Sequence, residues 1–394
     1  MSDNVVIVSA VRTAIGGFQG SLKDVSAPDL GKTVIEDVLK RAGVSGDQVD
    51  EVIMGNVLQA GIGQNPARIA AIRAGLPESV PSMTINKVCG SGLKSVHLAV
   101  QSILAGDSEI VVAGGMENMS QAPYLTMNAR SGFGMGDQKF VDSMVADGLT
   151  CAMENYHMAL PPRTLTDEYG FSREEQDEFA AWSHQKAEQA QVAGSFEDEI
   201  VPVEIPQRKG DPKRFLQDEH IRAGTTAEKL GKLRPAFKKD GSVSAGNASG
   251  INDAAAAVLV MSQQKANELG LQPSVRIRAN ASAGVSPRMM GIGPVPSTKK
   301  ALEKAGLSVG DIDLFEMNEA FAAQSLAVQR DLDLPREKIN VNGGAISLGH
   351  PIGASGTRVL VTLIHEMKRR GAKTGVASLC IGGGQGVATI VESV

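Results

Sequence analysis

Two of the chain's three cysteines and one of its six histidines each lie in a glycine-rich segment. Cys89 precedes Gly-Ser-Gly, His350 stands in the run Gly-His-Pro-Ile-Gly, and Cys380 precedes Ile-Gly-Gly-Gly. Glycine lets the backbone bring N–H groups close to a bound atom, while the adjacent thiol or imidazole does chemistry. A cysteine nucleophile needs a base or a helix N-terminus, and its histidine partner is usually distant in sequence. Cys89 and His350 meet that description.

The residues after Cys89 predict a helix that begins directly behind the thiol. Apolar side chains recur there at helical spacing, at Leu93, Val96, Ala99, Val100 and Ile103. The helix N-terminus should lower the pKa of the thiol and supply donors to a developing oxyanion. The alternative for any single cysteine is a small buried hydrophobe.

His350 and Cys380 lie in segments of different character. Residues 340–356 resemble neither helix nor strand, which suggests a backbone built around a ligand, although such turns also exist for geometry alone. Cys380 ends an apolar run, so its side chain should project from the carboxyl end of a strand, where open α/β sheets bind ligands. The chain has neither the dinucleotide glycine motif nor a Walker lysine, which disfavours nucleotide redox chemistry and ATP use.

Two further polar segments are candidates for the site. Asn318-Glu319 follows the apolar run Leu314–Glu316, and its amide could fix a water or an oxyanion, although helix capping is the alternative. Residues 244–250 form a polar turn by default.

Composition limits the function classes. With 42% hydrophobic and 21% charged residues the chain is typical of a globular protein. Three cysteines without a C-x-x-C pair argue against a disulfide framework and a structural zinc site, so no metal is expected. The net charge of −5 gives no reason to expect nucleic acid. The sequence has no basic leader and no run near the roughly 18 apolar residues of a membrane helix, so we expect the cytoplasm and no membrane.

The pattern of apolar runs predicts an α/β fold with an internal duplication. Residues 41–50 and 304–313 are similar, and each pair of flanking segments reads as a helix followed by a strand. Short apolar runs read as strands at Val5–Ser9, Glu51–Met54, Ile110–Ala113, Leu314–Glu316, Val376–Leu379 and Val387–Val391.

A segment of different composition separates the two halves, from about residue 117 to 246. Ser172 and Glu175 there have the spacing of a capping box, which predicts a helix start. Between Arg208 and Lys239 the sequence has ten Lys or Arg against four Asp or Glu. We interpret the segment as an insertion that covers the site.

Taken together, these segments resemble the thiolase family, most closely its short-chain biosynthetic branch, over essentially the full length. The motifs that carry the resemblance are Asn86–Leu93, Gly114–Ser120, Tyr156–Met158, Leu233–Phe237, Ala245–Asn252, Asn318–Gln324, Asn340–Gly356 and Leu379–Gly384. The resemblance implies a thiolase-like α/β fold, in which two duplicated halves with mixed sheets form α-β-α-β-α layers and carry an inserted loop domain. The implied domains are residues 1–118, completed by about 247–270, then 119–246 and 271–394.

The resemblance also implies a reversible Claisen condensation of two acetyl-CoA to acetoacetyl-CoA and CoA, through a thioester on Cys89. His350 would take the thiol proton, and Cys380 would remove the α-proton of the second acetyl-CoA. One set of oxyanion donors would be His350 with a water held by Asn318, the other the backbone N–H groups of Cys89 and Gly382. No cofactor is implied, because coenzyme A enters as a substrate.

Further residues are implied to bind that substrate. The resemblance places His157, Ala245 and Ser249 along the pantetheine arm, Arg222 and Phe237 near the nucleotide, and Met158, Met290, Ala320 and Phe321 close to the acyl group. A pocket walled by methionines should prefer short acyl chains. The basic stretch should meet the phosphates, and a homotetramer built as a dimer of dimers is expected.

Two positions depart from the family pattern. Met317 stands before Asn318 where a small residue is usual, and residues 160–163 replace a more helical continuation. A thiolase for longer 3-ketoacyl-CoA chains is the nearest alternative. A decarboxylating ketoacyl synthase and a non-catalytic acyl-CoA-binding relative are weaker ones.

Overall fold

The computed structural model describes residues 4–159, 165–236 and 241–394. Its main strands form one hydrogen-bonded path in the order β15-β16-β17-β14-β1-β13-β5-β3-β4. The path joins the two halves of the chain where β1 (Val5–Thr13) meets β14 (Val275–Gly284) over only two residue pairs. The other strands on it are β3 (Glu51–Gly55), β4 (Ser82–Ile85), β5 (Ile110–Asn118), β13 (Asn252–Ser262), β15 (Leu314–Met317), β16 (Thr374–Ile381) and β17 (Gln385–Ser393).

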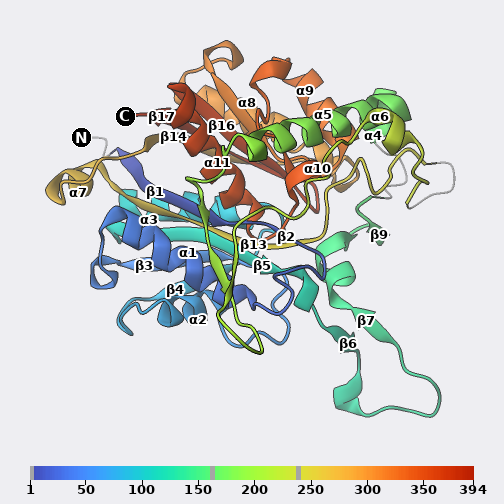
Figure 1. The fold of residues 1–394 in the computed structure, drawn as a ribbon, viewed down its shortest axis with the longest axis horizontal. Coiled ribbons are helices and arrows are strands. Elements are labelled where there is room, and N and C mark those ends of the chain that lie inside the picture. The colour runs from blue at the N-terminus through green and yellow to red at the C-terminus, as the bar shows by residue number, and fades with distance from the viewer. Residues whose placement is uncertain (1–3, 160–164, 237–240) are drawn as a thin grey trace.

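Helices lie between the two parts of the sheet and outside each of them (Figure 1). Between them, α3 (Ser91–Ala105) packs against α11 (Ser355–Arg370) in an apolar cluster that takes strands from both halves. The outer face of the N-terminal half is covered by α1 (Ala27–Ala42) and α2 (Pro66–Arg73). The outer face of the C-terminal half is covered by α8 (Pro294–Ala305) and α9 (Ala322–Asp331). The predicted α-β-α-β-α layering is therefore confirmed.

The duplicated segments have the same local structure. Asp50 accepts two backbone N–H groups at the start of β5, at 2.7 and 2.8 Å. Asp313 accepts two at the start of β16, at 2.8 and 3.0 Å. Gly43 and Gly306 end the preceding helices in the left-handed conformation, with φ of 68° and 67°. In each copy, therefore, a glycine ends a helix, and an equivalent aspartate just before the next strand binds the start of the parallel strand beside it.

Each of the six predicted runs lies in a strand, but β13 was missed. This strand contains four consecutive alanines, which favour helix, and it is buried on both faces, so polar and apolar residues do not alternate. It pairs with β1 and β5 along most of its length. Tertiary pairing therefore overrides local propensity here.

The segment between the halves contains a long helix and several hairpins. The predicted capping box is present, because Glu175 N–H donates to Ser172 Oγ at 3.1 Å and Ser172 N–H to the Glu175 carboxylate at 2.7 Å. The helix it opens is α5 (Arg173–Val192). The departure at residues 160–163 lies outside the described residues.

Short elements complete the described chain, and none of its helices is long and apolar enough to cross a bilayer. The short strands are β2 (Gly16–Gly17), β6 (Tyr124–Thr126), β7 (Phe140–Asp142), β8 (Thr150–Cys151), β9 (Tyr156–His157), β10 (Ile200–Val201), β11 (Val203–Ile205) and β12 (Lys213–Phe215). The short helices are α4 (Leu165–Tyr169), α6 (Ala227–Gly231), α7 (Gln263–Glu268) and α10 (Ala345–Leu348).

Candidate active site

Cys89 lies in a tight turn between β4 and α3, directly before the helix N-cap Gly90. Val88 has a φ of 48°, a conformation that β-branched residues rarely adopt. Such strain persists only where the surroundings enforce it, and it is common at functional turns. This conformation could not be predicted from the sequence, because valine is not a residue that usually marks a left-handed turn.

The Cys89 sulfur is surrounded by backbone donors and a second thiol. The backbone N–H groups of Gly382 and of Cys89 itself lie near enough to this sulfur to favour its thiolate form. Cys380 lies at the end of β16, close enough to Cys89 for the two thiols to interact electrostatically. A side chain on Gly382 would meet Met158, whose Cε lies 2.2 Å from the position that a Cβ would take. Segments almost three hundred residues apart thus meet at one sulfur.

Both thiols are protonated in the resting protein. Burial raises the pKa of Cys89 to about 11, although the N–H groups of Gly382 and Cys89 act in the opposite direction. Burial, followed by the neighbouring Cys89, raises the pKa of Cys380 further. The expectation that the helix N-terminus would lower the Cys89 pKa was therefore wrong, because desolvation of the thiolate outweighs the helix and amide contributions.

His350 lies in the turn before α11 and is fixed on three sides. Its backbone N–H donates to Asn252 Oδ1 at 2.9 Å, and its Nδ1 lies 2.6 Å from Ser355 Oγ. The Ser355 hydroxyl donates to the Pro351 carbonyl, so it accepts from His350. This assigns the proton to Nδ1 and leaves Nε2 as an acceptor, 3.5 Å from Asn318 Nδ2.

His350 is also neutral. Burial, reinforced by the charge of Arg358, lowers its pKa to about 3. A buried, neutral imidazole with a free Nε2 is suited to accept a proton. Ser355 and Asn252, which orient it, were not among the predicted site residues.

The turns that carry Cys89 and His350 pack directly against each other. A Cβ on Gly356 would lie 2.2 Å from the backbone nitrogen of Leu93, so the first turns of α3 and α11 approach more closely than a side chain allows. Ile352 packs in the same small apolar cluster as Cys89. The glycine-rich sequence of both turns is explained by this close approach.

The methionines expected near an acyl group line an apolar pocket, although Cys89, His350 and Cys380 are not among its lining residues. Met158, Met290 and Phe321 form its wall together with Gly383, the residue after Gly382. The pocket continues to further apolar residues, among them Cys151, Tyr156, Leu165, Pro287, Gly291 and Ala323.

The other predicted binding residues are only partly brought together. Ser249 N–H donates to the Ala320 carbonyl at 3.0 Å, so the turn at 244–250 lies against the segment after Asn318. Ala245 is exposed, and His157 is half-buried in β9. Arg222 is exposed and does not line the apolar pocket.

Phe237 lies outside the described residues. Met317, the unusual residue before Asn318, is buried in the core of the C-terminal half. Within the described ranges, no group of His, Cys, Asp and Glu side chains is arranged to hold a metal ion.

The layered, duplicated fold and the buried thiol pair describe an acyltransferase that works through cysteine. The family models for the thiolase N-terminal and C-terminal domains match residues 5–264 and 271–393. The chain belongs to the thiolase family.

Individual relatives cover the whole chain. An "Acetyl-CoA acetyltransferase" of Allochromatium vinosum is 60% identical over 100% of both chains, and one of Pseudomonas aeruginosa is 62% identical over 98% of both. The crystal structure of the Bacillus anthracis acetyl-CoA acetyltransferase has a TM-score of 0.97 at 48% identity and covers 100% of this chain and 99% of its own. Human mitochondrial 3-ketoacyl-CoA thiolase has a TM-score of 0.96 at 46% identity, with the same coverage.

Proposed function

We propose that the protein is an acetyl-CoA C-acetyltransferase, which interconverts two acetyl-CoA with acetoacetyl-CoA and CoA by a ping-pong mechanism. The observation that carries the proposal is the Cys89 sulfur, which faces two backbone N–H donors with a second thiol beside it. The names of relatives that are 60–62% identical over nearly their full length agree with it.

In the first half-reaction, Cys89 attacks the carbonyl carbon of acetyl-CoA while its proton moves to His350 Nε2. Because the pKa of Cys89 is raised, the thiolate forms only as the carbon–sulfur bond forms. The carbonyl oxygen develops negative charge between the N–H groups of Cys89 and Gly382. The Cys380 thiol protonates the departing CoA sulfur, which leaves acetyl-Cys89 and a Cys380 thiolate.

In the second half-reaction, the Cys380 thiolate removes an α-proton from a second acetyl-CoA. The resulting carbanion attacks the acetyl-Cys89 carbonyl, forms the new carbon–carbon bond and expels the Cys89 sulfur. That sulfur takes its proton back from His350, so both thiols and the histidine return to their resting states. Thiolysis is the reverse sequence.

The two thioester oxygens use different donor sets. The N–H groups of Cys89 and Gly382 surround the sulfur that carries the acetyl group, so they serve the acyl-enzyme oxygen. The second set, Asn318 and His350, serves the oxygen of the thioester that loses its α-proton. Asn318 Oδ1 is buried and has no hydrogen-bond partner among the described residues, so it is available to hold a water there.

We propose that the coenzyme A phosphates bind near α6. The basic stretch is divided in the structure, because Arg208–Arg214 belongs to the β11–β12 hairpin, whereas Lys229, Lys232 and Arg234 lie in or directly after α6. The α6 part lies beside the proposed pantetheine turn, since Leu230 packs against Gly246 and Ala236 N–H donates to the Val243 carbonyl at 3.0 Å. Exposed Lys229 and Arg234 are the candidate phosphate ligands.

One observation favours a second candidate substrate class, longer 3-ketoacyl-CoA. The apolar pocket is lined by Cys151 and Tyr156 as well as by Met158, Met290 and Phe321. A longer acyl chain would contact more of these apolar side chains than an acetyl group does.

A comparison of substrates tests both candidates. Cleavage of acetoacetyl-CoA by CoA should be rapid in the wild type and lost in Cys89→Ser. Activity confined to the four-carbon substrate supports acetyl-CoA specificity, while kcat/KM that rises with chain length supports the longer-chain class. No cleavage of any 3-ketoacyl-CoA would overturn the proposed function.

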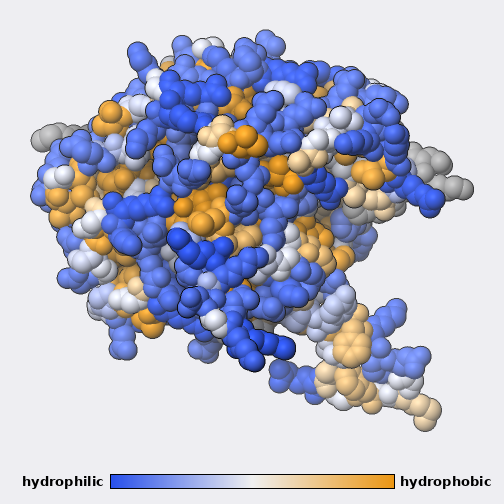
Figure 2. Space-filling view, viewed as in Figure 1, coloured by the Kyte–Doolittle hydropathy of each residue, from blue (hydrophilic) through white to orange (hydrophobic). Residues whose placement is uncertain are grey.

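We further propose a homotetramer built as a dimer of dimers. The β6–β7 hairpin projects from the body of the molecule (Figure 1), and apolar side chains lie beside hydrophilic ones on it (Figure 2). Its large apolar side chains are 54–107% exposed, at Tyr124, Met127, Phe133, Met135 and Phe140. A second surface is the edge strand β4, which has a neighbour on one side only. A Phe140→Asp variant should be smaller than the wild type in sedimentation; an unchanged mass would overturn the role of the hairpin.

The domain division into 1–118 with 247–270, 119–246 and 271–394 remains our proposal. It is supported by β13, which pairs with β1 and β5 although the insertion separates them in sequence. Limited proteolysis that cuts first near residues 118 and 246 would support it.

We propose that the protein works in the cytoplasm and needs no cofactor besides its CoA substrates. Its three cysteines are free, which suits a reducing compartment. Cell fractionation, and assays of enzyme dialysed against chelator, test these two points.

A further inference from the structure

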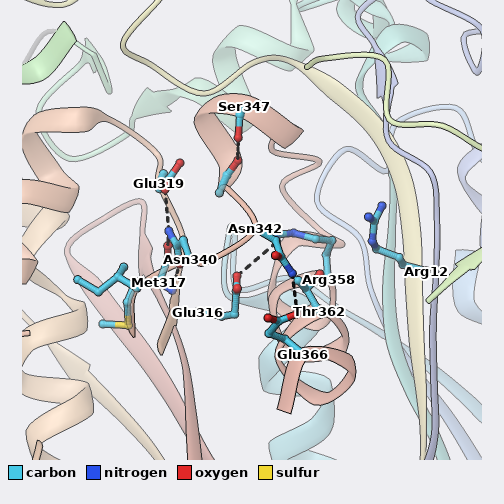
Figure 3. A network of polar contacts seen from close by, with 12 residues as sticks. Arg12, Glu316, Met317, Glu319, Asn340, Asn342, Ser347, Arg358, Thr362 and Glu366 are labelled. Atoms are coloured by element: carbon cyan, nitrogen blue, oxygen red, sulfur yellow. Dashed lines mark hydrogen bonds and ion pairs between the residues drawn. The ribbon is translucent and has the colours of Figure 1, made fainter. Parts of the chain in front are cut away.

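Asn318 is held in place by its two neighbours in sequence. Met317 N–H donates to Asn340 Oδ1 at 2.8 Å, and Asn340 Nδ2 donates to the Met317 carbonyl at 2.8 Å. The same amide nitrogen donates to Glu319 Oε1 at 2.7 Å, as Figure 3 shows. The Asn340 side chain thus replaces a neighbouring strand at the end of β15 and holds the backbone of Met317 and the side chain of Glu319, on either side of Asn318.

The Glu319 carboxylate joins three segments of the chain. It is fully buried, and its Oε2 accepts from Ser183 Oγ at 2.6 Å and from Ile346 N–H at 3.3 Å. Ser183 belongs to α5 of the inserted segment, and Ile346 to the turn that leads to His350. The end of β15, the His350 segment and the insertion therefore meet at one carboxylate.

The His350 segment is shaped around this carboxylate. A Cβ on Gly344 would lie 2.2 Å from the carboxyl carbon of Glu319, so only glycine fits there. Gly344 N–H donates to Ser183 Oγ at 3.1 Å, and Ser347 Oγ lies 2.9 Å from the same oxygen. The position of the chain six residues before His350 thus depends on Glu319 and Ser183.

The side chain of Asn318 makes few contacts that would fix it. Its Nδ2 lies 3.5 Å from His350 Nε2, and its Oδ1 has no partner in the described parts of the chain. Its distance to His350 is therefore set by the backbone at 317–319 and by the turn at 344–350. Among the side chains of the described residues, Glu319 alone hydrogen-bonds to both Asn340 and that segment.

We propose that Glu319 is a positioning residue that sets the distance between Asn318 and His350, and so forms the donor set for the thioester that loses its α-proton. The proposal rests on the proposed function. The Cys89–Gly382 donor set does not depend on this carboxylate, because its N–H groups belong to the turns before α3 and after β16. Glu319 therefore acts mainly on the second half-reaction, which needs both Asn318 and His350, and on the first only through the position of His350.

The variant Glu319→Gln tests the assignment. Its side chain has nearly the same shape but a single acceptor oxygen, so an NH₂ group must face either the Asn340 amide or the Ser183 and Ile346 donors. Displacement of a reacting group by about 1 Å costs on the order of 10²-fold in rate. We expect kcat for condensation to fall by about that factor while KM for acetyl-CoA changes little.

Two half-reaction assays distinguish a specific role of Glu319 in positioning Asn318 and His350 from a general loss of structure in the variant. Exchange of the acetyl-CoA methyl hydrogens with deuterated solvent reports α-proton removal, and single-turnover acetylation of Cys89 reports the first half-reaction. In Glu319→Gln, exchange should slow on the order of 10²-fold, while Cys89 acetylation should slow clearly less, because acetylation uses His350 but not Asn318. Ser183→Ala, which removes one of the donors, should slow exchange less.

Glu366→Gln is the matched control. Glu366 is also buried and accepts from Asn342 Nδ2 at 2.8 Å in the same segment, but none of its hydrogen bonds reaches Asn318 or Glu319. This variant should lower the melting temperature and leave the ratio of exchange to acetylation unchanged.

The outcomes distinguish failure of the Glu319 positioning role from failure of the proposed function. Equal slowing of exchange and acetylation in Glu319→Gln, or unchanged rates of both, would overturn the positioning role. If Glu319→Gln does not fold, the same ratio in Ser183→Ala decides. A wild type that neither acetylates Cys89 nor exchanges acetyl-CoA hydrogens would instead overturn the proposed function itself.

Discussion

The substitution Gly382→Ala tests whether the backbone N–H groups at the Cys89 sulfur matter for catalysis. The added Cβ would lie 2.2 Å from Met158 Cε and 3.0 Å from its Sδ. Carbon atoms in contact are about 3.5–4.0 Å apart, so one side must move by more than 1 Å. Gly382 is not among the residues with positive φ, so alanine introduces no backbone strain of its own.

The size of the loss in kcat depends on whether the backbone at Gly382 or the side chain of Met158 moves. If the backbone yields, the Gly382 N–H leaves the sulfur, and loss of one oxyanion donor costs on the order of 10²–10³ in kcat, or about 3–4 kcal/mol. If only the flexible end of Met158 yields, kcat falls much less. The double variant Gly382→Ala with Met158→Ala removes the obstructing atoms and should recover most of the loss relative to Met158→Ala alone.

The assay is kcat for CoA-dependent cleavage of acetoacetyl-CoA, with single-turnover acetylation of Cys89 beside it. Gly284→Ala is the matched control, because its Cβ would meet only one atom, the Gly384 carbonyl oxygen at 4.0 Å. A Gly382→Ala enzyme within threefold of the wild type would refute the donor role. A double variant that shows no recovery would refute the steric argument.

Three further predictions concern stability. His97 is buried, and burial together with Lys94 lowers its pKa to about 3. In the unfolded chain this histidine binds a proton below about pH 6.5, so the stability that comes from burying it neutral is present above that pH and is lost as the pH falls. The variant His97→Gln should therefore reduce the dependence of the unfolding free energy on pH by up to one proton, about 1.4 kcal/mol per pH unit. Denaturant titrations between pH 6.5 and 4 measure this change. Asp313→Ala removes a carboxylate that accepts two N–H groups of β16 and should lower unfolding free energy by about 1–3 kcal/mol, while equal stability would contradict the shared role of Asp50 and Asp313. Ser172→Ala removes the N-cap of α5 and should cost about 1 kcal/mol in the same titration, with the exposed Ser274→Ala as control.

The sequence predicted correctly those features that depend on residues close together in the chain. The glycine-rich turns at Cys89 and Cys380 were recognised as candidate sites because glycines mark close backbone approach, and the family resemblance implied that the two share one site. The structure places Cys380 beside Cys89. The capping box at Ser172 was likewise predicted, because it depends on two residues three positions apart.

Features that depend on distant packing could not be predicted. The four alanines of β13 form a strand only because β1 and β5 lie on either side of it. The direction of the Cys89 pKa shift depends on burial, which no local pattern reports. The role of Ser183 depends on where α5 docks, 136 positions from Glu319 in sequence.

The most direct test of the central claim is to identify the residue that acetyl-CoA acetylates in the absence of free CoA. Mass spectrometry of peptides from wild-type enzyme quenched in acid should show one acetyl group, on the peptide that contains Cys89, and CoA should remove it with formation of acetyl-CoA. Cys380→Ser should still acquire the label at Cys89, more slowly. Stable acetylation at Cys380 or Cys151 instead, or none at Cys89, would contradict the account.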